Sequence, residues 1–262
     1  MNVAEGIVIG VDIDAVCADH NAAFREHVAD ALGVSPGTLG EQLDWNYRSW
    51  GLSDEDFLRI HQQGVRESMF LDMPPIPGVK DALKSLAKQG ATIRVITHRL
   101  YAPHNHQKAI SDTAAWLDKH RIPYHDLCMV GDKPAVYADV YIDDAPHNVR
   151  ALRDKTEKPV IVFDQPYNQD LDGPRVSGWD EVPQMVLDVT GVTGRLMQGT
   201  LFNADEVAED PLAHLSPRDR TTAGKSGTTK LASRLCGAPT LDHGKPCRRP
   251  VLSGKACPDH TR

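Results

Sequence analysis

The chain has 262 residues, of which 40% are hydrophobic and 25% are charged, a composition typical of a soluble globular protein that can bury a sizeable core. No apolar run approaches the ~20 residues that a membrane-spanning helix needs, which argues against an integral membrane protein of that type. Residues 1–5 carry no basic region, which argues against a signal peptide. The five cysteines, an odd number without secretion signals, indicate reduced thiols and a cytoplasmic location.

The first predicted element is a strand over residues 7–14 that ends in two carboxylates. Its apolar, β-branched start is typical of an interior strand of a parallel sheet, and such strands deliver catalytic groups at their carboxyl ends. Asp12 and Asp14 are two residues apart, so on a strand both would point to the same side. Adjacent acids repel and are seldom kept unless a cation or a reaction uses them. The alternative is an Asp-rich turn that caps the next helix.

Two further strand ends carry side chains suited to an anion. The strand predicted over residues 92–96 runs into Thr97 and His98, where a hydroxyl followed by free backbone N–H groups can hold phosphate oxygens. Lys133 follows a short strand over residues 127–130 and could neutralise a phosphate or a carboxylate. Each has an ordinary alternative, which is a threonine in a turn or an exposed loop lysine.

A fourth strand, over residues 140–144, closes in a second pair of acids, Asp143 and Asp144. Strand and helix patterns alternate along the chain, which favours a doubly wound parallel α/β sheet. Residues 18–75 are the exception, because they contain no convincing parallel strand and show helical periodicity. The other predicted elements are helices over residues 79–88, 107–120 and 182–189, a short helix after Pro146, and a strand over residues 158–164.

The order Asp-x-Asp, Thr, Lys, Asp-Asp, each at a strand end, resembles the four motifs of the haloacid dehalogenase superfamily of phosphatases. Within that superfamily, residues 11–19 are similar to the first motif of the 5'(3')-deoxyribonucleotidase family, the cytosolic type C 5'-nucleotidases. Residues 75–79, 132–133 and 141–144 match that family as well. The resemblance implies a haloacid dehalogenase-like, Rossmann-like phosphatase domain over residues 1–190. Its helical insert, about residues 18–75, would be a cap that excludes water and reads the leaving group.

The resemblance also implies a role for each motif residue. Asp12 would attack phosphorus to give an aspartyl-phosphate. Asp14 would protonate the departing ester oxygen and then deprotonate the water that hydrolyses the intermediate. Thr97, His98 and Lys133 would hold the phosphoryl oxygens as the bond breaks.

A hard divalent cation suits such a set of oxygen ligands, and Mg²⁺ is the expected ion. Its implied ligands are the Asp12 carboxylate, the Asp14 backbone carbonyl and a carboxylate of the pair Asp143 and Asp144, with the choice between these two acids open. We therefore expect a Mg²⁺-dependent phosphomonoesterase, a 5'-nucleotidase that acts on ribo- or deoxyribonucleoside monophosphates. The alternatives are a phosphatase of another small phosphoester and a nucleic-acid or partner-binding protein that works through its C-terminal tail.

Three positions differ from the family pattern. Ala15 stands where the family usually has Gly, His20 stands where an aromatic associated with the nucleobase is usual, and His98–Arg99 replaces Ser-Pro. The first difference is small, and the other two leave the nucleobase and sugar preference open. His20 and Trp45, the latter within an aromatic cluster at residues 44–50, are the candidate substrate contacts, because aromatic rings stack on nucleobases. The aromatic cluster could instead belong to the core.

The composition changes after about residue 190. Residues 191–232 are predicted to form a flexible linker, ahead of a short tail over residues 233–262. Residues 217–262 carry 10 Lys and Arg against 3 Asp and Glu, whereas the remainder carries 19 against 33. This asymmetry indicates a distinct basic tail.

The tail contains Cys236, Cys247, Cys257 and His260 in the spacing C-x10-C-x9-C-x2-H. Three thiolates and one imidazole predict a closed, tetrahedral structural zinc site, whose metal would supply folding energy to so short a segment. The segment resembles small zinc-binding tails appended to bacterial and phage proteins. The alternative is free cysteines in a disordered tail. Its basic side chains could contact nucleic acid phosphates or simply face solvent.

Overall fold

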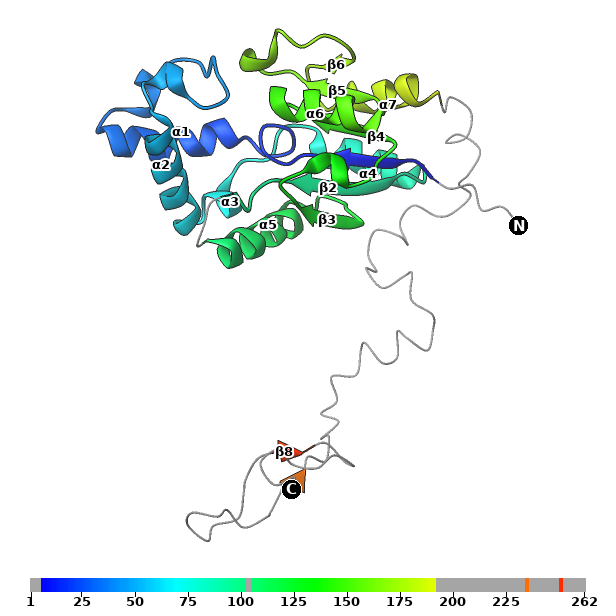
Figure 1. Ribbon diagram of the computed structural model, residues 1–262, viewed down its shortest axis with the longest axis horizontal. Coiled ribbons are helices and arrows are strands. Elements are labelled where there is room, and N and C mark those ends of the chain that lie inside the picture. The colour runs from blue at the N-terminus through cyan, green and yellow to red at the C-terminus, as the bar shows by residue number, and fades with distance from the viewer. Residues whose placement is uncertain (1–5, 102–104, 192–233, 236–249, 252–262) are drawn as a thin grey trace. The chain divides into compact units, whose positions relative to one another are not determined.

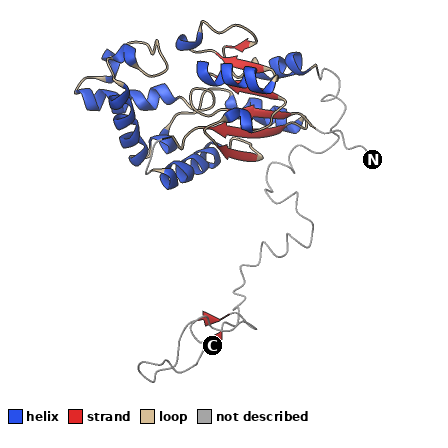
Figure 2. Ribbon diagram, viewed as in Figure 1, coloured by secondary structure: helices blue, strands red, loops and turns tan. Residues whose placement is uncertain are grey.

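The described part of residues 1–202 is built on a six-stranded sheet with helices on both faces (Figures 1 and 2). The computed structural model describes residues 6–101, 105–191, 234–235 and 250–251. The chain divides into two compact units, residues 1–202 and residues 203–262. Within the described ranges, no helix combines the length and the apolar character that crossing a membrane requires.

All six strands of the sheet run parallel, in the order β3-β2-β1-β4-β5-β6. Central β1 pairs with β2 on one side and β4 on the other, so Val11 lies beside both Val95 and Ile142. The carboxyl ends of these three strands therefore meet at one edge of the sheet. The strands are β1 (Val8–Val11), β2 (Thr92–Thr97), β3 (Asp126–Met129), β4 (Val140–Asp143), β5 (Val160–Phe163) and β6 (Arg175–Val176).

Helices cover both faces of the sheet because successive strand residues point to opposite sides. Val95 lies in the core cluster that contains residues of α4, α5 and α7, whereas the next residue, Ile96, lies in the cluster that contains residues of α6. Gly90 follows the end of α4, with a φ of 94°, and the Ala91 N–H donates to the carbonyl of Leu86 at 3.1 Å. The α/β prediction with a parallel sheet is confirmed. These helices are α4 (Val79–Lys88), α5 (His106–His120), α6 (Pro146–Thr156) and α7 (Val182–Thr190).

The segment between β1 and α4 is helical and lies beyond the strand ends (Figure 1). It enters and leaves the core through two adjacent backbone segments, since the Ile76 N–H donates to Cys17 O and the Asp19 N–H donates to Pro74 O, both at 2.8 Å. Asp19 also caps the first helix through its side chain. The insert contains α1 (His20–Leu32), η1 (Pro36–Thr38), η2 (Arg48–Trp50), α2 (Asp54–Arg66) and α3 (Met69–Asp72).

Two further 3-10 turns matter for the site, η3 (Lys133–Ala135) and η4 (Pro166–Asn168). In the second unit, β7 (Arg234–Leu235) pairs antiparallel with β8 (Pro250–Val251). The residues predicted to bind zinc, which are Cys236, Cys247, Cys257 and His260, lie outside the described residues, and so does nearly all of the segment predicted to be a linker.

The prediction that Asp12 and Asp14 lie on one strand is wrong. β1 ends at Val11, and the chain then turns because the carbonyl of Ile13 accepts hydrogen bonds from three backbone N–H groups, those of residues 16–18. Ala15 takes a left-handed conformation in this turn, with a φ of 60°. Ala15 stands where the family usually has glycine, and in this left-handed conformation an alanine carries backbone strain that a glycine would not.

We expect Ala15→Gly to change the free energy of unfolding by less than about 1 kcal/mol. The left-handed conformation costs a non-glycine residue about 1–2 kcal/mol, and the entropy that glycine loses on folding, roughly 0.5–1 kcal/mol, offsets most of the relief. Ala15→Val should lose about 1 kcal/mol or more, because a β-branched side chain tolerates positive φ poorly. Chemical denaturation measures both variants, and equal stability of all three proteins would contradict strain at this position.

Candidate active site

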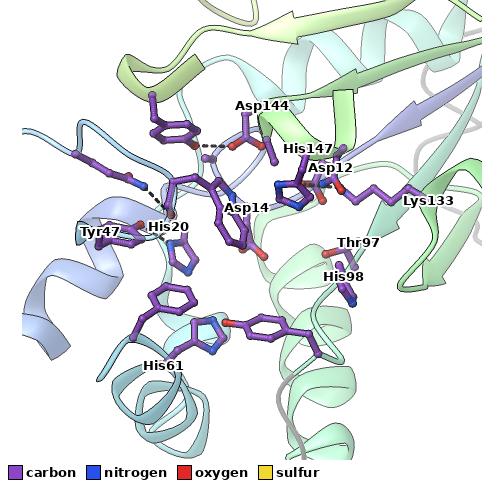
Figure 3. Close-up of a pocket in the computed structure, with 18 residues that line it drawn as sticks. Asp12, Asp14, His20, Tyr47, His61, Thr97, His98, Lys133, Asp144 and His147 are labelled. Carbon is purple, nitrogen blue, oxygen red and sulfur yellow. Dashed lines mark hydrogen bonds and ion pairs between the residues drawn. The ribbon is translucent and has the colours of Figure 1, made fainter. Parts of the chain in front are cut away.

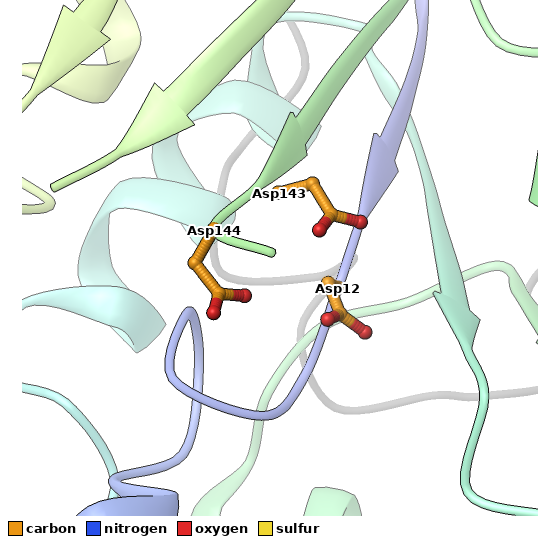
Figure 4. Close-up of side chains that lie close together, drawn as sticks. All are labelled: Asp12, Asp143 and Asp144. Atoms are coloured by element: carbon orange, nitrogen blue, oxygen red, sulfur yellow. The ribbon is translucent and has the colours of Figure 1, made fainter. Parts of the chain in front are cut away.

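A cluster of three buried carboxylates lies where β1 and β4 end side by side (Figure 4). Asp12 follows β1 directly, and its N–H donates to Ile142 O in β4 at 3.0 Å. Asp143 is the last residue of β4, and Asp144 follows it. Each of the three acids offers a carboxylate oxygen, and these oxygens all lie within 4.8 Å of one another. The parallel pairing of two strands thus assembles acids that are more than 130 residues apart in the sequence.

Lys133 is the cation of this cluster. Its Nζ lies 2.9 Å from Asp12 Oδ2 and 2.6 Å from Asp143 Oδ2, and its side chain is 3% exposed. Burial raises the pKa of Asp12, which Lys133 partly offsets, and burial together with Asp143 raises the pKa of Asp144. Three carboxylates around one ammonium leave two negative charges when all are ionised, so the donor set fits a hard divalent cation.

Asp143 and Asp144 have different partners. Besides the lysine, Asp143 accepts hydrogen bonds at Oδ1 from the Ala145 N–H at 3.0 Å and from Asn148 Nδ2 at 3.3 Å. Asp144 Oδ2 accepts a hydrogen bond from the hydroxyl of Tyr167 in η4. In the part of the chain that the structure describes, no hydrogen bond reaches Asp144 Oδ1. Asp144 therefore keeps an oxygen for a ligand, whereas Asp143 is engaged by the protein.

Thr97 and His98 stand at the end of β2. Thr97 is fully buried, and its Oγ1 has no hydrogen-bond partner among the described residues. A buried hydroxyl without a partner is unfavourable, so a phosphate oxygen is a fitting partner for it. His98 packs against the backbone of Gly131, where an added Cβ would lie 3.3 Å from the His98 Nε2. Both residues face the same cavity as Lys133 (Figure 3).

Asp14 is neutralised separately, by Arg99. The Arg99 side chain is fully buried and donates to both oxygens of Asp14, with Nη2 2.6 Å from Oδ1 and Nε 3.1 Å from Oδ2. Burial opposes the charge of Asp14, but the guanidinium outweighs it through charge and hydrogen bonds and lowers the pKa of Asp14 to about 2. This environment thus favours the carboxylate form of Asp14.

A cavity of about 220 Å³ lies between these strand ends and the insert (Figure 3). Its insert side is aromatic. His20 Nδ1 lies 2.8 Å from the hydroxyl of Tyr47, and the His20 ring stacks on His61 with 5.7 Å between centroids and an interplanar angle of 18°. Trp45 reaches His147 of α6 edge to face, with 4.8 Å between centroids. The two candidate substrate contacts, His20 and Trp45, therefore both line the cavity.

The structure brings together every residue predicted for catalysis, phosphate binding and Mg²⁺ binding, namely Asp12, Asp14, Thr97, His98, Lys133, Asp143 and Asp144. Sequence reasoning missed the contributions of Arg99, Tyr47, His61 and Tyr167. In the sequence Arg99 is visible only as a departure from the family pattern, because its partner Asp14 is 85 residues away. The aromatic cluster at residues 44–50 is open to two interpretations from the sequence, substrate contact and core packing, and it contains residues of both kinds. Trp45 and Tyr47 line the cavity, whereas Trp50 is buried in the core.

Residues 6–192 match the model of the family described as "5' nucleotidase, deoxy (Pyrimidine), cytosolic type C protein". The chain belongs to this family. A relative from Chlorobaculum tepidum, named "Putative 5'(3')-deoxyribonucleotidase", is 37% identical over 182 residues, which are 69% of this chain and 90% of the relative. The 5'(3')-deoxyribonucleotidase of Bacillus subtilis is 26% identical over 185 residues, covering 69% of this chain and 98% of that protein.

Among solved structures, a haloacid dehalogenase-like family hydrolase from Streptococcus pneumoniae aligns with a TM-score of 0.49 and 15% identity, over 70% of this chain and all of that one. The family membership identifies the chain as a phosphoric monoester hydrolase of the 5'-nucleotidase type. The sequence-based prediction of the family is confirmed.

Burial of His61 should make the stability of the fold depend on pH. This side chain is 2% exposed, its Nδ1 has no hydrogen-bond partner among the described residues, and burial lowers its pKa to about 3. Between pH 6.5 and about 3 the unfolded chain binds a proton at His61 that the folded protein does not, so stability falls as the pH falls through this window. The slope is up to about 1.4 kcal/mol per pH unit.

We therefore expect His61→Phe to gain about 1 kcal/mol relative to the wild type between pH 7 and pH 5.5, measured by chemical denaturation. Phenylalanine suits the site because Phe24, Phe57 and Phe70 surround it. Ile110→Phe, at an exposed position of α5 without an ionisable side chain, is the control and should give a difference that does not vary with pH. A pH-independent difference for His61→Phe would contradict the prediction.

Proposed function

We propose that this nucleotidase is a Mg²⁺-dependent phosphomonoesterase that hydrolyses nucleoside 5'-monophosphates through an aspartyl-phosphate. The observation that carries the proposal is the cluster of Asp12, Asp143 and Asp144 around Lys133, next to the unpartnered hydroxyl of Thr97. It combines a nucleophile, an excess of negative charge suited to a divalent cation and donors for phosphoryl oxygens. These are the parts that cleavage of a phosphate monoester requires.

In the first half-reaction, an oxygen of Asp12 bonds to phosphorus as the bond from phosphorus to the ester oxygen breaks. Asp14 gives its proton to that oxygen. In the second, water bonds to phosphorus, the Asp12–phosphorus bond breaks, and Asp14 takes the proton of the water. Thr97 and Lys133 donate hydrogen bonds to the phosphoryl oxygens throughout. The Arg99 charge favours the carboxylate form of Asp14, and this form can accept the proton of the water in the second half-reaction. In the first half-reaction Asp14 must instead carry a proton, which the Arg99 charge disfavours.

Mg²⁺ would be held by the Asp12 carboxylate, the Asp14 backbone carbonyl and the Asp144 carboxylate. It would supply charge neutralisation for the phosphoryl group. Asp144 is preferred over Asp143 because its Oδ1 is free of hydrogen bonds in the described structure. Asp143 would instead hold Lys133 and the start of α6 in place.

The substrate class rests on the cavity wall and on the relatives. Those relatives are named as deoxyribonucleotidases, and the insert presents His20, Tyr47 and Trp45 to the cavity, a surface suited to a nucleoside. The sugar and base preference stay open, because His20 replaces the aromatic that is usual in the family. A small non-nucleotide phosphoester is the alternative substrate.

Phosphate release from ribo- and deoxyribonucleoside 5'-monophosphates and from common sugar phosphates tests the proposal. We expect nucleotide hydrolysis that chelation by EDTA abolishes and Mg²⁺ restores. Asp12→Asn should lower kcat by about 10³-fold or more, because the nucleophile is lost. Asp170→Asn is the matched control, since Asp170 pairs with Arg150 on the surface and should keep full activity.

Asp144→Asn should in addition raise the Mg²⁺ concentration needed for half-maximal activity, by about tenfold or more. Asp143→Asn should lower kcat with a smaller change in this Mg²⁺ requirement. Hydrolysis of sugar phosphates alone would overturn the nucleotide assignment. Full activity in EDTA would overturn the Mg²⁺ dependence.

We also propose that Cys236, Cys247, Cys257 and His260 bind one structural Zn²⁺. The support is the donor set, three thiolates and an imidazole, and the position of Cys236 and Cys247 in the sequence between the paired strands β7 and β8. Such a site would contribute folding energy to a segment too short for a core of its own.

Elemental analysis of the full chain, purified without chelators, should give about one zinc per chain, as a single four-ligand site requires. Cys257→Ser should lose the metal, because one of four ligands is removed. Cys128→Ser, at a cysteine of β3 outside the set, should retain it. Absence of zinc from the wild type, or equal zinc in both variants, would refute the site.

A further inference from the structure

Arg99 is a buried cation whose charge pairs with a carboxylate of the active site. Its side chain is fully buried, and its fork of donors reaches both oxygens of Asp14, through Nη2 at 2.6 Å and Nε at 3.1 Å. Lys133 serves Asp12 and Asp143 and makes no ion pair with Asp14 in the described structure. The two cations therefore divide the site, one for the metal-binding cluster and one for the acid/base.

The guanidinium itself is held on several sides. Nη1 donates to Thr113 Oγ1 of α5 at 3.1 Å, and that hydroxyl donates in turn to Ala109 O at 2.6 Å. The guanidinium carbon lies 4.2 Å from the centroid of the Phe70 ring in α3. Nη2 also contacts the sulfur of Met73 at 3.4 Å. A planar fork fixed by α3 and α5 can impose one orientation on a carboxylate that accepts from it at two points.

Stability alone does not explain this arrangement. A buried ion pair recovers little more than the cost of taking both charges out of water, and apolar side chains of similar volume often stabilise a core as well or better. An apolar residue at position 99 could replace the packing of Arg99, but it could not fix the direction of the Asp14 carboxylate. That direction matters because proton transfer requires the donor and acceptor atoms within hydrogen-bond distance.

We propose that Arg99 is a positioning residue that orients the Asp14 carboxyl group for proton transfer to the ester oxygen and from the attacking water. Arg99 exchanges no proton and does not line the cavity in which the phosphoester would bind. It acts through Asp14, which gives its proton to the departing oxygen and regains one from water. The inference rests on the proposed phosphomonoesterase function.

The leaving group separates this role from a purely structural one. A nucleoside alkoxide leaves poorly without a proton, whereas p-nitrophenolate leaves readily without one. We expect Arg99→Met to lower kcat/KM for thymidine 5'-monophosphate by about 10²-fold or more, the usual contribution of general acid–base catalysis, and to lower kcat/KM for p-nitrophenyl phosphate much less. The comparison uses kcat/KM because kcat also contains the hydrolysis of the aspartyl-phosphate, which is the same step for both esters. Asp14→Asn should show the same pattern.

The double variant adds a second readout. If Arg99 acts through Asp14, Asp14→Asn with Arg99→Met should be no slower than Asp14→Asn alone. Thr113→Val, which removes an anchor of the guanidinium and leaves the ion pair, should give a smaller loss with the same dependence on the leaving group. Arg94→Met is the matched control, because Arg94 pairs with Asp126 at 2.7 Å away from the cavity, and both activities should be kept.

Equal losses of kcat/KM on the two esters in a folded Arg99→Met protein, or additive losses in the double variant, would overturn the proposal. Thermal denaturation reports folding, and if Arg99→Met does not fold, Arg99→Lys and Thr113→Val give the same comparison. Failure of the proposed function is a different result, since it would show in the wild type as no hydrolysis of any nucleotide. The ratio of activity on glycerol phosphate to activity on p-nitrophenyl phosphate would then still test Arg99.

Discussion

The contact on which the site depends is the bridge from the Lys133 ammonium to the carboxylates of Asp12 and Asp143. It joins the ends of β1 and β4 with the turn after β3, so three strand ends share one buried charge. Without the lysine, three acids would face one another in a region of low dielectric constant, which strongly favours their protonation. With it, two negative charges remain, and this excess is what a divalent cation can neutralise.

Asp14 belongs to a different electrostatic environment, although it is only two residues from Asp12. Arg99 satisfies it with a bidentate pair, and α3 and α5 hold the guanidinium. The site thus separates its carboxylates by function. One group shares Lys133 and has oxygens available for a metal, and the other is held by hydrogen bonds that set its direction. The end of β1 at Val11 makes this possible, because Asp14 lies in the turn that follows and not on the strand.

The aromatic side of the cavity comes from the insert between β1 and α4. Its two crossing segments are hydrogen-bonded to each other at Cys17 and Ile76, so the insert is fixed to the core at a narrow junction. His20 is the first residue of α1, capped by Asp19, and helix α2 brings His61 against it. Burial lowers the pKa of both histidines, so this wall is neutral at neutral pH and suits an uncharged nucleoside group.

The sequence by itself determined the parallel sheet, the strand ends that carry Asp12, Thr97, Lys133, Asp143 and Asp144, and the helical insert, because hydrophobic periodicity and short motifs are local signals. Only the tertiary structure decided that Asp14 leaves the strand, that Arg99 is its partner, that Asp144 rather than Asp143 has an oxygen free of hydrogen bonds from the described residues, and which aromatic side chains face the cavity. The physical reason is that these features depend on contacts between residues far apart in the chain. No local pattern encodes them, since a buried charge finds its partner only once strands and helices have packed.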